Sequence, residues 1–154
     1  MSVAFRRESD EEHLEPKFEL PIPSGRNLVT PRGLQLIRER VDALEAAAAA
    51  QSDAEARKPI ERDLRYWRTR LATAEVSPPP ADGIAGIGTR VTLRLAGRER
   101  SMAIVGHDEA DPEAGLVAFS APLAAAMIGL EAGEFADFNG QEDAIELLAV
   151  EPAG

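Results

Sequence analysis

The sequence predicts an α+β protein in which a helical hairpin precedes a small β-sheet domain. Two apolar rows with helical spacing, separated by a short polar break, predict the hairpin. A change to alternating apolar and polar residues near residue 89 predicts the sheet. A run rich in proline and glycine, residues 77–88, lies between the two patterns and is expected to be a linker.

The first helix is expected to begin just after Thr30. Threonine is a good N-cap, and Pro31 would occupy the first helical position, where its missing N–H costs nothing. The apolar positions that follow have the spacing of a coiled-coil seam, namely Leu34, Ile37, Val41, Leu44 and Ala48. This helix therefore needs a partner that covers its apolar edge.

A second row with matching spacing follows the polar break QSDAEARKP and consists of Ile60, Leu64, Trp67, Leu71 and Ala74. Because the break is short, the second helix should fold back on the first as an antiparallel coiled-coil hairpin. The hairpin, which we call the finger, is expected to span residues 28–76. With a rise of about 1.5 Å per residue, helices of about 20 residues make it roughly 30 Å long.

The segment before the finger, residues 1–27, is charged and then proline-rich. Its apolar residues are too scattered to build a core, so we expect a flexible tail. The segment after the linker, residues 89–151, alternates through Val91, Leu93 and Leu95, and then through Met102 and Ile104. Further short strands are expected near 116–119, 134–138 and 144–150, with one short helix that Pro122 begins. These elements make a small sheet domain.

Composition excludes several classes of protein. The chain has 154 residues, 44% of them hydrophobic, a formal net charge of −10 and no cysteine. Strong direct binding to nucleic acid is not expected, because such affinity depends on clustered Lys and Arg. Without cysteine there is no disulfide framework and no thiolate metal site. No segment has the pattern of a secretory signal or a membrane span, so a cytoplasmic location is expected.

The most acidic stretch is IVGHDEADPEAG, residues 104–115, which lies between two apolar runs. Its carboxylates and His107 suit a metal site in principle. Carboxylates packed this closely beside Pro112 and Gly115 are more typical of a solvated loop, which is the interpretation we favour. No serine or cysteine with a recognisable motif accompanies His107, so a nucleophilic triad is not predicted.

The order of motifs resembles the GreA/GreB family of bacterial transcription elongation factors. The resemblance is carried by TPRG at the start of the hairpin, TAEV at its end, the strand GTRVTL, and then IVGHDEAD and GLVAFSAPLAAAMIG. The first residues, MSVAF, are similar to the tail of GreB-like members. The match extends from about residue 27 to residue 150.

This resemblance implies that the sheet domain is FKBP-like and binds RNA polymerase at the rim of the secondary channel, while the finger enters the channel. The implied polymerase-binding residues are Asp108, Glu109 and Asp111 in the acidic stretch, and Ser120, Ala121, Pro122 and Leu123 at the following corner. The carboxylates would steer association with a basic partner surface. The protein itself would be a monomeric regulator, not an enzyme.

The family's finger tip carries two carboxylates that help to hold a catalytic Mg²⁺ in the polymerase, which then cleaves backtracked RNA. Here the only candidates are Asp53 and Glu55, which would share that Mg²⁺, since the chain needs no cofactor of its own. They are two residues apart instead of three, and Arg57 and Lys58 beside them oppose cation binding. The finger is also shorter than the family pattern.

Two mechanisms remain open under this resemblance. The finger could stimulate cleavage weakly, or it could occupy the channel without cleavage. We favour the second mechanism, because a finger must reach the metal before its carboxylates can act on it. Two other functions fit the sequence less well. An FKBP-fold prolyl isomerase would need an apolar pocket lined by aromatic residues, and this chain has few. A coiled-coil adaptor would dimerise through the finger, but its seam is already covered within one chain.

Overall fold

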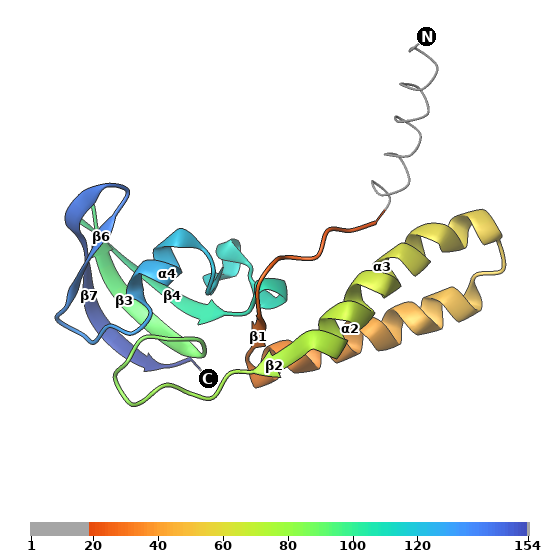
Figure 1. Cartoon of the computed structure of the whole chain (residues 1–154), viewed down its shortest axis with the longest axis horizontal. Helices are drawn as coiled ribbons and strands as arrows, with labels where there is room; N and C mark the ends of the chain where they lie inside the picture. Colours follow the sequence, from red (N-terminus) through yellow and green to blue (C-terminus); the bar gives the residue numbers. More distant parts are fainter. Residues whose placement is uncertain (1–18, 154) are drawn as a thin grey trace, which may run out of the picture. The chain divides into compact units, whose positions relative to one another are not determined.

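A computed structural model describes residues 19–153 of the chain (Figure 1). The described residues form two compact units. The finger unit contains residues 37–73 together with 19–25. The sheet unit contains Arg26–Leu36 and residues 74–153. The first turns of the first helix thus belong to the sheet unit.

The first helix, α2, runs from Pro31 to Ala50 and begins where the sequence predicts. The Thr30 hydroxyl accepts a hydrogen bond from the Gly33 N–H at 2.9 Å, and the Thr30 carbonyl accepts one from the Leu34 N–H at 2.9 Å. Thr30 is therefore a true N-cap.

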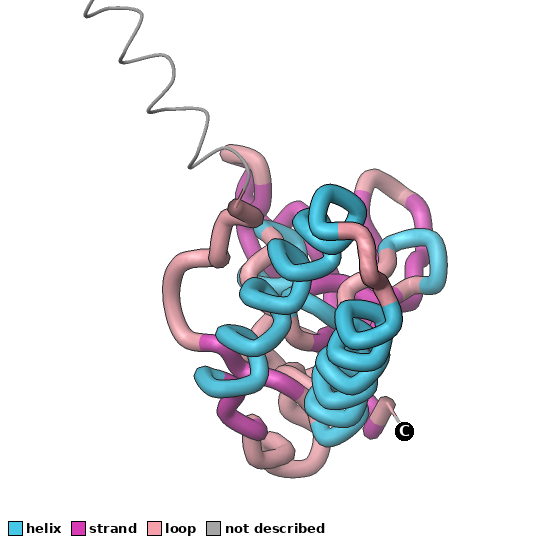
Figure 2. Tube along the Cα trace, turned by 90° about the vertical axis from the view of Figure 1, so that its right-hand side faces the viewer, coloured by secondary structure: helices cyan, strands magenta, loops and turns pink. Residues whose placement is uncertain are grey.

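The second helix, α3, runs from Ala54 to Thr73 after a three-residue connection, and Figures 1 and 2 show the two helices side by side. Ile37, Val41 and Leu64 are buried, and Trp67 is half-buried with the Arg40 guanidinium 5.3 Å from its ring centroid. The predicted antiparallel hairpin and its apolar seam are confirmed. Pro59 lies inside α3.

Two short strands at the base of the hairpin were not predicted. Strand β1, Asn27–Val29, pairs in parallel with strand β2, Ala74–Val76, so the chain enters and leaves the hairpin through one small sheet. Beyond the pair, the Ser77 N–H donates to the Val29 carbonyl at 2.9 Å. The predicted boundary between tail and finger, at residues 27 and 28, thus lies within strand β1.

The main sheet has five strands in the order β5-β4-β3-β7-β6. Its strands are β3 (Thr89–Leu95), β4 (Arg98–Val105), β5 (Leu116–Ala118), β6 (Phe135–Phe138) and β7 (Gln141–Pro152). Neighbours are antiparallel except for β4 and β5, which are parallel. The acidic stretch between them forms two short 3₁₀ turns, η1 (His107–Glu109) and η2 (Pro112–Ala114).

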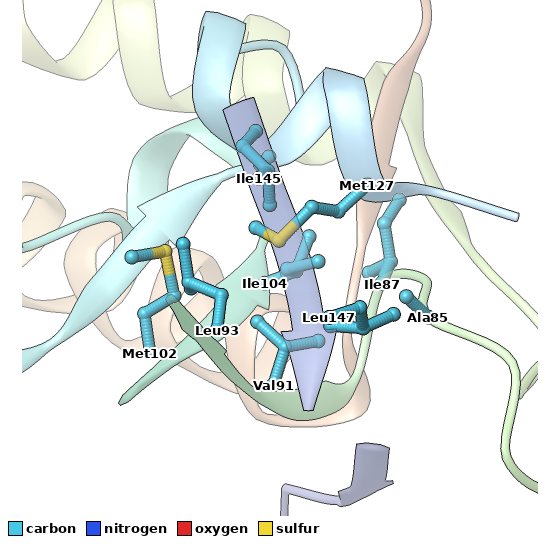
Figure 3. Packing of buried hydrophobic residues seen from close by; sticks show 10 residues of the cluster. Ala85, Ile87, Val91, Leu93, Met102, Ile104, Met127, Ile145 and Leu147 are labelled. Atoms are coloured by element: carbon cyan, nitrogen blue, oxygen red, sulfur yellow. The ribbon is translucent and has the colours of Figure 1, made fainter. Parts of the chain in front are cut away.

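The core of the sheet unit lies between the sheet and the short helix α4, Pro122–Met127. Figure 3 shows the Met127 side chain reaching from α4 over Ile104 and toward Ile145. These three side chains, together with Leu93 and Leu147, have no exposed surface. The predicted α+β class, with one short helix on a small sheet, is confirmed.

The segment 77–88 is only partly the linker that its composition predicted. Ala85 and Ile87 are buried in the core of the sheet unit, and Ile84 forms an isolated bridge with Glu131. The Ala85 N–H also donates to the Leu130 carbonyl at 2.9 Å. The sheet unit therefore begins well before residue 89, because a glycine-rich run can lie in a core when its few apolar side chains face inward.

Most of the predicted tail, residues 1–18, lies outside the described residues. In the part that is described, the Glu19 carboxylate forms a bidentate ion pair with the Arg65 guanidinium on α3. This hydrogen-bonded guanidinium lowers the pKa of Glu19 from its ordinary value. Because both side chains are exposed, the ion pair contributes little stability.

Candidate functional site

The tip of the finger is a capped turn. The Asp53 carboxylate accepts a hydrogen bond from the Ala56 N–H at 2.9 Å, and the Asp53 carbonyl accepts one from the Arg57 N–H at 3.0 Å. The Arg57 guanidinium in turn donates to the Gln51 carbonyl at 2.7 and 3.0 Å. Asp53 is thus the N-cap of α3, and Arg57 ties the turn to the end of α2.

The second candidate carboxylate, Glu55, lies in the first turn of α3 and forms an exposed ion pair with Lys58, at 3.1 Å. The two candidates are thus part of the local structure of the tip, one as a helix cap and one beside a cation. Within residues 19–153, no group of three or more His, Asp or Glu side chains is arranged to hold a metal ion.

The predicted polymerase-binding segments leave the sheet at one edge. Strands β4 and β5 are parallel, with Val105 opposite Ala118, so the segments that follow them begin side by side. The Phe119 N–H donates to the Val105 carbonyl at 2.8 Å and holds this edge together. The structure therefore places η1 and the corner before α4, two motifs that are apart in sequence, on a common edge.

Exposure differs among the predicted polymerase-binding residues. Asp111, Ser120 and Pro122 are exposed, and Asp108 and Ala121 are half-buried. Leu123 is half-buried and packs against the core of the sheet unit, so its main contact is internal. The accessible surface at this edge therefore combines two carboxylates with a serine and a proline.

Glu109 differs from its acidic neighbours. Its side chain is only 7% exposed, and its Oε1 accepts a hydrogen bond from the Thr30 hydroxyl at 2.6 Å. Its Oε2 lies 3.7 Å from the Arg32 Nε. Glu109 thus faces the start of α2, which leaves little of its carboxylate for a partner protein. The sequence analysis did not predict this contact, because Thr30 and Glu109 are 79 residues apart.

A cavity of about 550 Å³ lies beside this contact, within the sheet unit. Proline and aliphatic side chains make up most of its lining, with Arg90 and Glu109 among the few charged groups. The lining contains no Phe, Tyr or Trp. An apolar cavity without aromatic walls does not match what we expected of an isomerase site.

Acidic side chains dominate the sheet unit. Its basic residues from position 74 onward are four arginines, Arg90, Arg94, Arg98 and Arg100, all on β3 and β4. One of them, Arg94, is paired with Glu146 at 2.9 Å. The unit therefore presents a negative potential, which suits a basic partner surface. No helix in the described part of the chain is long and apolar enough to cross a membrane.

The described residues define a two-part class of protein, in which a helical hairpin is followed by a small acidic α+β domain. The model of the GreA/GreB transcription elongation factor C-terminal domain matches residues 80–152. The chain is 31% identical to transcription elongation factor GreA of Alkalilimnicola ehrlichii, with 79% of this chain and 95% of that protein covered. It is 34% identical to GreA of Thermomicrobium roseum over 67% of each chain.

The chain belongs to the GreA/GreB family of transcription elongation factors. Among solved structures, the GreA/GreB factor from Nitrosomonas europaea is similar at 18% identity, with a TM-score of 0.40 over 83% of this chain and 99% of that one. The match to GreA of Alkalilimnicola ehrlichii and to the family model confirms the family resemblance that the sequence motifs predict.

Proposed function

We propose that this chain regulates transcription elongation by binding RNA polymerase at the secondary channel and placing its finger there with little or no stimulation of RNA cleavage. One observation carries the second half of this proposal: the Asp53 carboxylate caps α3 instead of standing free at the tip. A carboxylate that holds a backbone N–H has to give up that bond before it turns toward a cation.

The neighbours of Asp53 support the same conclusion. Lys58 is paired with Glu55, and the Arg57 guanidinium is held against the Gln51 carbonyl at the turn. Two cations at the tip oppose the accumulation of positive charge that a shared Mg²⁺ would bring. The tip therefore suits occupation of a channel better than metal-assisted hydrolysis.

Docking is proposed to use the edge at which β4 and β5 end. Asp108 and Asp111 would face basic groups of the polymerase, and Ser120, Ala121 and Pro122 would form the neutral part of the contact. Leu123 would act indirectly, by packing the corner against the core. The factor would bind as a monomer in the bacterial cytoplasm. GreB-like character rests on MSVAF, which lies outside the described residues, and remains a prediction.

The decisive experiment is transcript cleavage by a deliberately backtracked elongation complex. The wild-type protein is compared with an Asp53→Ala, Glu55→Ala double variant and with a matched control, Glu99→Ala, Glu142→Ala, which removes two exposed carboxylates from the sheet unit. We expect all three proteins to leave the RNA intact while competing with a cleavage-competent GreA for the polymerase.

Shortened RNA that appears with the wild type and the control, but not with the tip variant, would instead show that Asp53 and Glu55 are a working tip. If none of the proteins competes with GreA, the docking proposal is wrong. A chimera with a longer finger and a two-carboxylate tip adds a further test, since cleavage by it would show that reach and tip chemistry are what this chain lacks.

A further inference from the structure

The acidic 3₁₀ turn η1 contacts the point at which the chain enters the finger. The Glu109 Oε1 and the Thr30 Oγ1 are 2.6 Å apart, and both side chains are buried. Thr30 uses its hydroxyl twice, because the same oxygen accepts the Gly33 N–H at 2.9 Å. The carboxylate, the cap and the first turn of α2 therefore form one connected set of hydrogen bonds.

The Glu109 carboxylate is surrounded by polar and charged groups where it lies. It faces the amino-terminal end of a 20-residue helix, which carries partial positive charge. The Arg32 guanidinium lies 3.7 Å away on the exposed side. Burial of a carboxylate is costly without partners, and these groups supply them.

Two glycines allow the close approach. A Cβ at Gly33 would lie 2.9 Å from the Glu109 Oε1, so a larger residue there would push the carboxylate away. A Cβ at Gly106, just before η1, would lie 2.5 Å from the Leu28 carbonyl oxygen on β1. Glycine inside a helix costs up to about 1 kcal/mol, and at Gly33 the contact with Glu109 accounts for its presence.

We infer that Glu109 is a positioning residue that fixes the base of the finger on the sheet domain. The helix α2 continues without interruption from the capped turn to Ala50, so restraint of its first turn restrains the direction in which the helix leaves. The parallel pairing of β1 with β2 holds the return of the hairpin at the same place. Only the functional benefit of this role rests on the proposed function, since a finger that enters a channel needs a defined direction.

The absence of cysteine makes the inference directly testable. Spin labels are attached to Ser52→Cys at the finger tip and Ser101→Cys on β4, two exposed positions, and the distribution of distances between them is measured by pulsed electron resonance. In Glu109→Ala the hydrogen bond to Thr30 is lost. We expect a distribution about twofold wider than that of the parent, because the base gains local freedom.

Two further variants separate positioning from general damage. Glu109→Gln keeps a carbonyl oxygen that accepts from Thr30, and we expect its distribution to be close to that of the parent. Glu113→Ala removes an exposed carboxylate from the same acidic stretch and serves as the matched control. Unfolding curves of every variant confirm that the sheet unit is folded under the conditions of the measurement.

An unchanged distribution in folded Glu109→Ala would overturn the inference, as would equal widening in the Glu113→Ala control. If Glu109→Ala does not fold, the comparison passes to Thr30→Val, which removes the hydroxyl donor, and an unchanged width in that variant would likewise overturn it. These measurements use the free protein, so they fail or succeed independently of polymerase binding, which the competition with GreA tests.

Discussion

The Asp53 carboxylate accepts the Ala56 N–H at 2.9 Å, so the first acidic residue of the finger tip is the N-cap of α3. This relationship decides how the tip should be interpreted. A capping carboxylate satisfies a backbone donor that has no partner within the helix, and such a residue is selected by helix stability alone. The presence of an acidic residue at the tip therefore needs no catalytic explanation.

Replacement of Asp53 with alanine should destabilise the finger by about 1 kcal/mol, the usual cost of a lost N-cap. Asp53→Asn should retain most of the stability, because its side-chain oxygen also accepts from the Ala56 N–H. Denaturant unfolding followed by the fluorescence of Trp67, the one tryptophan of the chain, measures both effects. Equal losses in the two variants would argue that charge, and not capping, is what Asp53 contributes.

Truncation of the finger's seam should have a larger effect. Ile37 has no exposed surface, and Ile37→Ala should cost about 2–5 kcal/mol through lost burial and the cavity left behind. Arg38→Ala, at the neighbouring exposed position, is the matched control and should change stability by less than about 0.5 kcal/mol. The same unfolding assay applies. Similar losses in both variants would contradict the assignment of Ile37 to the seam.

The sequence predicted the finger well because its signals are local. The cap at Thr30 and the repeat through Ile37 and Val41 determine a helix and its buried face without reference to the rest of the chain. The strands β1 and β2 were missed for the opposite reason. Each has three residues, and their pairing joins positions 47 residues apart, such as Asn27 and Ala74.

The acidic stretch shows the same limit within the candidate site. Its composition predicted a solvated loop, which describes Asp111 and Glu113, both exposed. Glu109 has the same chemistry but is buried against Thr30, and only the fold reveals which carboxylate turns inward. A local signal did exist in Gly106 and Gly33, since both permit a close approach, but the sequence does not say what approaches.

Substitution of Gly106 by alanine tests the packing of η1 against β1. The added Cβ would lie 2.5 Å from the Leu28 carbonyl oxygen, which is backbone and has little freedom to move. We expect a loss of about 1–3 kcal/mol, as is typical of overpacked sites. Hydrogen exchange of the Ser77 N–H, which is bonded to Val29, should accelerate if β1 is displaced. Ala114→Ser, an exposed change in η2, is the control and should leave this exchange unaltered.

The Glu19–Arg65 ion pair makes a prediction about pH. The hydrogen bond from Arg65 lowers the pKa of Glu19 from its ordinary value, so the carboxylate is stabilised in the folded protein. A lowered pKa means that the pair is fully formed above the unfolded value, and is lost as the pH falls through the lower folded value. A carbon-detected titration of the Glu19 carboxyl should therefore show a midpoint below the ordinary value of a glutamate in the wild type.

Arg65→Gln should return that midpoint toward the ordinary value, because it removes the charged donor. Added salt should act in the same direction, since both side chains are exposed and open to screening. Arg68→Gln is the matched control: Arg68 lies on the same helix and is paired with Glu45. If the Glu19 midpoint changes in Arg68→Gln but not in Arg65→Gln, the segment before β1 contacts a different part of α3.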